Sequence, residues 1–410
     1  MTRLLLKGAT VFDGEGDTPR GGTSVLISGD TIVAVGPAGE VDNLEDCSVV
    51  DLSGQFLLPG FINVHDHLLT KRVRGSRAER ALATRADSLA TGLQSAWLNL
   101  SEGFTTLRDA GSLDALSLEI KRIFGSGKVI GPRIVSCGTG LTVTAGYAHA
   151  LFKEVDTPDE ARKAAGQLVK QGCDWIKCMA SIEWERGEGE PISAVNMGVE
   201  LMRAAFDLAH HHGLRCMAHA IADDAVRNAV EAGADSVEHG AMLSEGTAEL
   251  LASRGVFLVS TLSGYREHCE EWGRGEGVVR HGLELRPNHD LAFRRARAAG
   301  VRMAYGSDTL GNLVDELSMA QAMGATTAEC IEMLTITGVE LLGLADRIGS
   351  IAPGKQADLT VLGSDPRGGP SAFADVGLVF RAGQSFEPAR LPIHAPAPTV
   401  RTTETGRHAP

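Results

Sequence analysis

The sequence predicts an α/β protein: a (β/α)8 barrel (TIM barrel) with a small β-sandwich domain that the two ends of the chain form together. Three observations support this fold class. Apolar strand-like runs alternate with Ala-rich helical stretches through the middle of the chain, which is typical of a parallel sheet. Many of these runs end in a polar or ionisable residue. Segments that alternate apolar and polar residues occur near both ends.

The predicted barrel spans residues 58–346 and contains eight candidate strands. A closed barrel suits them best because closure removes the sheet edges and gathers the strand ends at one rim. An open doubly wound sheet is the alternative, but it would bring fewer strand ends together. The candidate strands are FINVHDH, TTLRDAG, RIVSCG, WIKCMA, RCMAHA, DSVEHG, VFLVST and RMAYGSD.

The two ends of the chain are expected to fold together. Residues 1–57 alternate apolar and polar side chains, and Gly29-Asp30 between two such runs predicts a hairpin turn. A similar alternation of apolar and polar residues occurs in ADLTVLGSDP and VGLVFRAGQSF, so residues 347–390 are predicted to complete the β-sandwich. Residues 391–410 hold several prolines and few apolar side chains, which is typical of a flexible tail.

Composition and charge narrow the function. The chain has 410 residues, of which 43% are hydrophobic, enough for a large core. A net charge of -13 argues against a nucleic-acid partner. No apolar run is long enough to cross a membrane. The start is too short for a signal peptide, and several of the 7 cysteines lie in apolar runs. We therefore expect a cytoplasmic protein with a small-molecule substrate. The sequence leaves open whether the chain forms a homo-oligomer.

A pair of histidines closes the first predicted barrel strand. His65 and His67 lie two residues apart, so both side chains point to the same face, while Asp66 points the other way. Spacing alone leaves two interpretations open, a chelating pair or two polar residues at a strand end. His219 and His239 close predicted strands five and six, and Asp308 closes strand eight. These further potential ligands at strand ends favour the interpretation of the histidine pair as a metal site.

Lys177 lies inside the fourth predicted strand, between Ile176 and Cys178. Strand alternation directs its side chain to the opposite face from these apolar neighbours. A lysine inside a barrel must lose its charge or find a partner, because burying an unpaired ammonium is costly. Reaction of the neutral amine with carbon dioxide is one solution. It gives a carbamate, an anion whose two oxygens can bridge two cations.

These strand-end residues resemble the metal ligands of the amidohydrolase superfamily: His65, Asp66 and His67 after LLPGF, Lys177, His219, His239, and Asp308 in GSD. The resemblance covers nearly the whole chain, from VVDLSGQFLLPGF to GSIAPGKQADLTVL. Segments such as GPRIVSCGTGLTVT and CMAHAIADDAVRNAVEAGADSVEHG resemble the branch that contains proline-type dipeptidases, dipeptidases that release C-terminal basic residues, and ochratoxin-type amidases.

The resemblance implies a role for each ligand. Two divalent metal ions, usually zinc, would share a hydroxide and polarise a carbonyl together. Asp308 would take the proton of the water and pass it to the leaving amine. The expected reaction is cleavage of an amide bond in an N-acyl amino acid or dipeptide-like substrate. The more buried metal would be held by His65, His67 and Asp308, the more exposed one by His219 and His239, and a carboxylated Lys177 would bridge them.

Further residues are candidates for substrate contact. His149 lies where this branch carries a histidine that stabilises the oxyanion, although the branch has Gly-Gly-His and this chain has Gly146-Tyr147-Ala148-His149. Tyr147 in this turn is therefore a second candidate. Tyr265 lies where the branch often has a tyrosine that contacts the scissile carbonyl. For each, the alternative is an ordinary loop residue.

The loop after His67 contains Arg72 and Arg74, which could bind a substrate carboxylate or simply be solvated. The run His210-His211-His212 reads as a helix end, and His289 lies in a polar segment and is expected to be exposed. Neither is expected to hold a metal.

Other functions on the same scaffold remain open. A single-metal deaminase is disfavoured, because such enzymes usually lack the lysine and carry a glutamate just beyond the fifth-strand histidine. Here Lys177 is present and Ala220 follows His219. A cyclic-amide hydrolase shares the lysine bridge and stays an alternative. A catalytically inactive binding protein is disfavoured, because every ligand position is filled.

Overall fold

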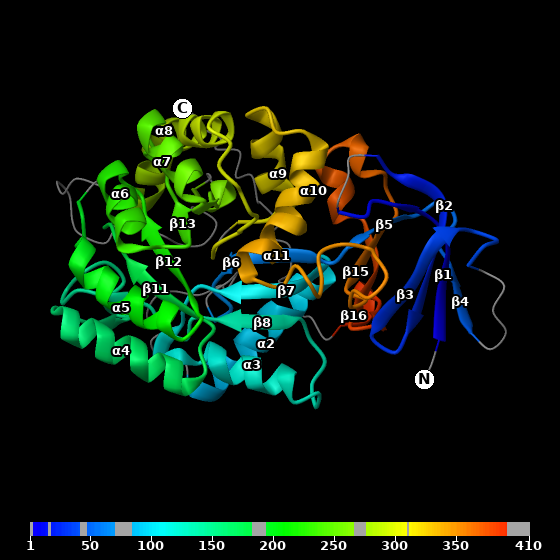
Figure 1. Ribbon diagram of the computed structural model, residues 1–410, viewed down its shortest axis with the longest axis horizontal. Coiled ribbons are helices and arrows are strands. Elements are labelled where there is room, and N and C mark those ends of the chain that lie inside the picture. Colours follow the sequence, from blue (N-terminus) through cyan, green and yellow to red (C-terminus); the bar gives the residue numbers. More distant parts are fainter. Residues whose placement is uncertain are drawn as a thin grey trace, which may run out of the picture.

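The computed structural model describes residues 3–14, 18–41, 47–69, 84–182, 194–265, 276–309 and 311–391. Figure 1 shows a small sheet at one end of the molecule and a larger body of parallel strands and helices at the other. The tail predicted for residues 391–410 lies outside the described residues, apart from Leu391.

Parallel strands form the centre of the larger body, and their side chains are buried on both faces. One sheet has three strands and the other has six. The first has the order β6 (Phe61–Asp66), β7 (Phe104–Asp109) and β8 (Arg133–Ser136). The second has the order β10 (Lys153–Glu154), β9 (Leu141–Thr142), β11 (Trp175–Met179), β12 (Arg215–Ala220), β13 (Ser236–His239) and β14 (Phe257–Val259). The first seven predicted barrel strands therefore form where the sequence places them.

The eighth predicted strand, RMAYGSD, is shorter than expected, and the described strands do not form one closed eight-stranded ladder. The segment makes an isolated parallel bridge between Met303 and Leu258. It still lies between β14 and β6, because the Ala304 N–H donates to the Leu258 carbonyl (3.1 Å) and the Val64 N–H to that of Tyr305 (2.9 Å). At Asp308 the backbone is left-handed (φ 53°), so extended strand geometry does not continue through this residue.

Helices follow most of the parallel strands and cover them from outside (Figure 1). A typical one is α4, which begins with a capping box between Thr157 and Glu160 and ends at Gly172 in the left-handed conformation. Within the described residues, no helix is long and apolar enough to cross a membrane. The helices are α2 (Arg85–Ser101), α3 (Ser117–Gly125), α4 (Pro158–Gln171), α5 (Val199–His211), α6 (Asp223–Ala232), α7 (Glu245–Arg254), α8 (Glu276–Ala298), α9 (Leu313–Ala322), α10 (Thr327–Leu334) and α11 (Ile336–Leu342).

Strand β11 shows how the fold orients the polar residues of the parallel sheets. Ile176 and Cys178 join an apolar cluster with residues of α4 and α5, such as Leu168 and Phe206. Lys177 between them does not belong to that cluster, although its side chain is equally buried. The alternation of the strand therefore sends this lysine to the face opposite the helices.

The two ends of the chain share one mixed sheet. Its order is β17 (Gln384–Phe386), β16 (Val376–Arg381), β15 (Leu359–Leu362), β5 (Phe56–Pro59), β1 (Arg3–Val11), β2 (Arg20–Ser28) and β3 (Thr31–Pro37), and β4 (Ser48–Asp51) pairs with β1. The predicted turn at Gly29-Asp30 joins β2 to β3. Side chains from both ends, such as Ile27 and Leu359, meet in one core.

Contacts between this sheet and the larger body lie at the amino ends of the parallel strands. Arg133 at the start of β8 forms an ion pair with Asp358 (2.9 Å). The Thr360 hydroxyl donates to the carbonyl of Gly103, just before β7 (2.8 Å). The small sheet is therefore attached away from the carboxyl ends of the strands, where active sites of barrels lie.

Candidate metal centre

Three predicted ligands come together at the carboxyl ends of the parallel strands. His65 is the residue before the last one of β6, His67 follows the strand, and Asp308 ends the segment beside it. Their ligand atoms all lie within 4.8 Å of one another. The distance from His67 Nε2 to Asp308 Oδ1 is 3.8 Å, so the two atoms are close but too far apart for a good hydrogen bond.

His219 and His239 lie beside this group, because β12 and β13 are neighbours and both end here. Their ring centroids are 4.7 Å apart. The centroids of His65 and His239 are 5.1 Å apart, so the His239 ring connects the two groups. The structure therefore brings the five predicted histidine and aspartate ligands to one place.

Lys177 is also inside the body, with a relative exposure of 1%. Its Nζ lies 5.7 Å from the centroid of the Phe152 ring. Burial lowers the pKa of Lys177, while the carboxylates of Glu238 and Asp308 oppose this shift. A lowered pKa raises the fraction of neutral amine, which is the form that reacts with carbon dioxide.

Hydrogen bonds orient three of the rings so that Nδ1 faces outward from the group. Nδ1 of His65 lies 2.6 Å from Glu238 Oε2, and that of His67 lies 2.8 Å from the Gly111 carbonyl oxygen. Nδ1 of His239 lies 2.7 Å from the Thr261 hydroxyl, whose own proton goes to the Ser260 carbonyl. Each partner accepts, so each Nδ1 carries the proton and each Nε2 offers a lone pair.

The charge states also fit a cation. Burial lowers the pKa of His65 well below its usual value and that of His239 to about 4, so both rings are neutral near pH 7. Burial alone would raise the pKa of Asp308, but the surrounding histidines lower it, and the group is a carboxylate. Within the described part of the chain, the buried Nε2 of His65 has no hydrogen-bond partner. This orphaned nitrogen and the nitrogen-oxygen donor set fit zinc.

The backbone at two ligands is left-handed, with φ 74° at His239 and 53° at Asp308. Such conformations are uncommon outside glycine and cluster at functional sites. Gly306 allows the close approach of the last segment, because a Cβ there would lie 2.7 Å from the Cβ of His65.

Two buried charged residues of the site were not predicted. Glu238 precedes His239 on β13, and Arg108 lies on β7; both side chains have zero relative exposure. They form an ion pair (2.8 Å) directly behind His65. Their signal in the sequence was the interruption of two buried strands, SVEH and FTTLRD, by a charged residue. Such a residue must be paired.

Comparison with known proteins assigns the family. The sequence profile of the Amidohydrolase family matches residues 56–386. The chain belongs to the amidohydrolase family. It is therefore a hydrolase acting on carbon–nitrogen bonds, in a family that generally uses a divalent metal and has a TIM-barrel fold. This confirms the resemblance found in the sequence.

Several relatives of this amidohydrolase are similar over most of its length. Ochratoxinase from Aspergillus niger is 26% identical over 368 residues, which cover 81% of this chain and 75% of ochratoxinase. A crystal structure of a prolidase complexed with N-methylphosphonate-L-proline has a TM-score of 0.87 and 27% identity, covering 94% of this chain and 100% of the prolidase. The crystal structure of the A. niger ochratoxinase, at 23% identity, shares the fold, with a TM-score of 0.83 and coverage of 94% and 96%.

Tyr147 lies against the candidate metal centre of this amidohydrolase. Its ring stacks on that of His219, with centroids 4.7 Å apart and planes inclined by 24°. The backbone of Tyr147 is fixed on both sides, because its N–H donates to Asn196 Oδ1 (3.2 Å) and its carbonyl accepts from the Thr142 hydroxyl (2.8 Å). Asn196 also donates to the carbonyl of Met179 at the end of β11 (2.7 Å). The turn is thus tied to the strand that carries Lys177.

The other predicted substrate residues are placed differently. The His149 side chain is half-exposed, and its Nδ1 lies 3.9 Å from Glu154 Oε1. Tyr265 is the last residue of the short 3-10 helix η2 (Leu262–Tyr265), which follows β14. Arg72 and Arg74 lie outside the described residues. The roles of these four residues stay predictions.

Two expectations about other histidines have different outcomes. His289 was expected to be exposed, which is wrong: it is 2% exposed, because α8 packs it against the backbone of Ser260 and His239. Burial lowers its pKa to about 4. His210 lies in the last turn of α5, as expected. Its Nε2 is 2.9 Å from Asp235 Oδ2, and Asp235 is not one of the predicted ligands.

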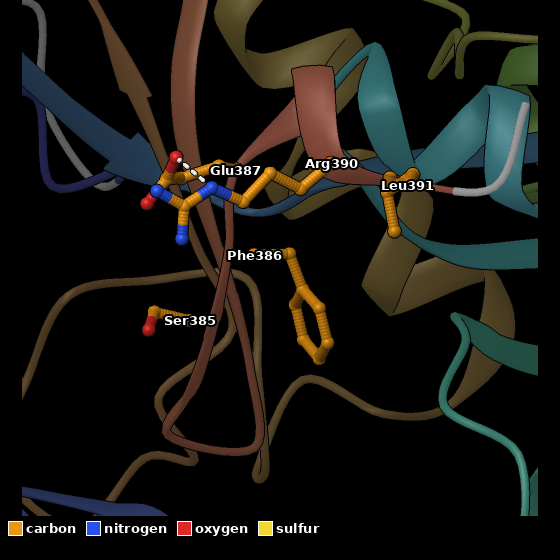
Figure 2. A pocket seen from close by; sticks show the side chains of 5 residues that line it. All are labelled: Ser385, Phe386, Glu387, Arg390 and Leu391. Carbon is orange, nitrogen blue, oxygen red and sulfur yellow. Dashed lines mark ion pairs between the residues drawn. The ribbon is translucent and has the colours of Figure 1, made fainter.

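A pocket of about 250 Å³ lies elsewhere, on the small sheet and the 3-10 helix η6 (Pro388–Arg390). Figure 2 shows its lining, in which Arg390 Nε pairs with Glu387 Oε2 at 2.9 Å. Ser385, Phe386 and Leu391 complete it. It contains none of the predicted ligands, so the candidate active site is the histidine group at the carboxyl ends of the strands.

Proposed function

We propose that this amidohydrolase cleaves the amide bond of a small N-acyl amino acid or dipeptide-like substrate with the help of two divalent cations, most simply zinc. The observation that carries the proposal is the group of four histidines and Asp308 at or next to strand ends, together with the buried Lys177 in the middle of β11. His65, His67 and Asp308 would hold one cation, and His219 and His239 the other. A carboxylated Lys177 would lie between them. The two parallel sheets would together form the wall of the barrel.

The cations, when bound, would polarise the scissile carbonyl and lower the pKa of water. The protein supplies the proton transfer. Asp308 is a carboxylate, the form that accepts a proton from the attacking water, and it would then donate that proton to the leaving amine.

Residues around the centre would select the substrate. Among the predicted substrate residues, Tyr147 stacks its ring on that of His219, so we assign it to the wall of the substrate site. Arg72 and Arg74 would bind a free carboxylate next to the scissile bond. The names of the similar proteins, ochratoxinase and prolidase, support an amide or peptide-like substrate.

A hydrolysis screen tests the proposal. Zinc-loaded protein is incubated with N-acyl amino acids, dipeptides and the same compounds with the carboxylate blocked, and Asp308→Asn serves as the inactive control. Cleavage of free acids in preference to blocked ones is the expected result. Equal cleavage of both would remove the carboxylate assignment. Turnover of cyclic amides alone would support the alternative of a cyclic-amide hydrolase.

A further inference from the structure

A buried network of hydrogen bonds stands behind His65. Glu238 reaches across from β13 and places Oε2 2.6 Å from Nδ1 of His65. Both side chains have zero relative exposure. A carboxylate buried this completely must be compensated by donors or a positive charge.

Arg108 and Ser236 supply that compensation at the other carboxylate oxygen. Arg108 Nη2 donates to Glu238 Oε1 (2.8 Å), and so does the Ser236 hydroxyl (2.6 Å). Arg108 Nη1 donates to the same hydroxyl (3.1 Å), and Nε donates to the Val64 carbonyl. The guanidinium lies over the Trp175 ring, 4.4 Å from its centroid. The arginine is therefore fixed, and Oε1 is occupied by two donors while Oε2 faces His65.

We infer that Glu238 is a positioning residue that keeps the proton of His65 on Nδ1. The Nε2 atom would then present its lone pair to the cation proposed between His65, His67 and Asp308. This inference rests on the proposed function only in naming that cation. A carboxylate has no proton of its own to donate, so the imidazole must be the donor in this contact. Hydrogen bonding of the second ring nitrogen to a carboxylate also fixes the ring plane and makes the ligand more basic.

The substitution Glu238→Gln shows what the charge contributes. Arg108 and Ser236 both donate at the position of Oε1, so the amide oxygen must lie there and the amide NH2 must face His65. An NH2 group only donates, so Nδ1 of His65 would have to accept, and its proton would move to Nε2. A protonated Nε2 cannot bind a cation. Glutamine has almost the same volume as glutamate, so the main change in this variant is the tautomer of His65.

Nuclear magnetic resonance of the metal-free protein tests the inference directly. Long-range proton–nitrogen spectra of protein with labelled histidine report which ring nitrogen carries the proton, and the spectrum of His65→Gln assigns the signal. We expect Nδ1–H at His65 in the natural chain and Nε2–H in Glu238→Gln. A proton on Nε2 in the natural, metal-free chain would overturn the inference, whether or not the variant folds.

Zinc competition gives a second readout. Loss of such an outer partner typically weakens metal binding about 10–100-fold, and we expect Glu238→Gln to do so. Asp358→Asn is the matched control, since Asp358 is also buried and paired with Arg133 (2.9 Å) but contacts no predicted ligand. It should keep the zinc affinity. Equal weakening in both variants would assign the effect to general destabilisation and overturn the inference. If the natural chain binds no zinc while the tautomer is as expected, the proposed function fails and the positioning role stands.

Discussion

At the scale of single residues, the site depends on burial. His65, His219 and His239 have pKa values lowered chiefly by burial, so their rings remain neutral near pH 7. Burial also lowers the pKa of Lys177, which favours the amine over the ammonium. The same low-dielectric surroundings that would penalise an isolated charge therefore prepare these side chains for cations.

Replacement of the buried lysine is the sharpest test at this scale. Lys177→Ala should lose zinc and lower activity by orders of magnitude while the circular dichroism spectrum stays native, because only the bridging anion is removed. Short carboxylic acids should restore part of the rate by occupying the space. Elemental analysis and hydrolysis rates measure both effects. Full activity and zinc content in Lys177→Ala would show that the lysine is not part of the centre.

At the scale of elements, the predictions from sequence were best where a strand is buried on both faces. Seven barrel strands and the Gly29-Asp30 turn form where the apolar runs and turn residues place them. The eighth segment was predicted as a full strand, but it makes only an isolated bridge at Met303, and the backbone is left-handed at Asp308. The histidines and the aspartate of the candidate site could be located from their positions at or next to strand ends. Glu238 and Arg108 were missed because their pairing joins strands far apart in sequence.

The close approach of the last segment to β6 gives a second test. A Cβ at residue 306 would lie 2.5 Å from Val259 Cγ1 and 2.7 Å from His65 Cβ. Gly306→Ala should therefore displace His65, weaken zinc binding and cost about 1–3 kcal/mol of unfolding free energy. Gly377→Ala is the control, because nothing lies within 4 Å of its added Cβ. Zinc titration and urea unfolding report the two effects, and unchanged zinc affinity in Gly306→Ala would contradict the explanation.

Helix α9 is tied to the loop after β14 by a buried carboxylate, Glu316, which accepts from the N–H groups of Leu262 (2.8 Å) and Ser263 (2.7 Å). Burial raises the pKa of Glu316 from 4.5 to about 7. Between these values the folded state keeps a proton that the unfolded state has lost. The contribution of this group to stability is therefore complete below about pH 4.5, falls as the pH rises to about 7, and stays lost above it.

Urea unfolding of the metal-free protein near pH 5 and near pH 8 measures this dependence. The contribution lost at the higher pH is up to about 3 kcal/mol, from the size of the pKa shift. In Glu316→Gln, which cannot titrate, this part of the pH dependence should vanish. An identical pH dependence in the natural chain and the variant would show that Glu316 does not titrate in this range.

At the scale of the whole molecule, the small sheet supports the parallel strands from the end opposite to the candidate metal centre. Arg133 of β8 pairs with Asp358, just before β15, and Phe61 of β6 packs against Phe373, in the connection between β15 and β16, with ring centroids 6.2 Å apart. The attachment should therefore affect stability more than catalysis.

Arg133→Met tests this attachment. It leaves the buried Asp358 with Arg381 as its remaining cationic partner and should lower the unfolding free energy by about 3 kcal/mol. Adding Asp358→Asn to the same chain should recover part of this loss, because it removes a buried charge that has lost one of its two cationic partners. Zinc content should be unchanged in both variants. Loss of zinc together with stability would mean that the sheet and the metal centre are coupled.

The most direct test of the account is diffraction from zinc-loaded crystals on either side of the zinc absorption edge. We predict two anomalous peaks per chain, one next to His65, His67 and Asp308 and one next to His219 and His239, with the side-chain density of Lys177 extended by a carbamate between them. A single peak, no peak among these residues, or an unmodified Lys177 amine directed away from two peaks would contradict the proposed centre.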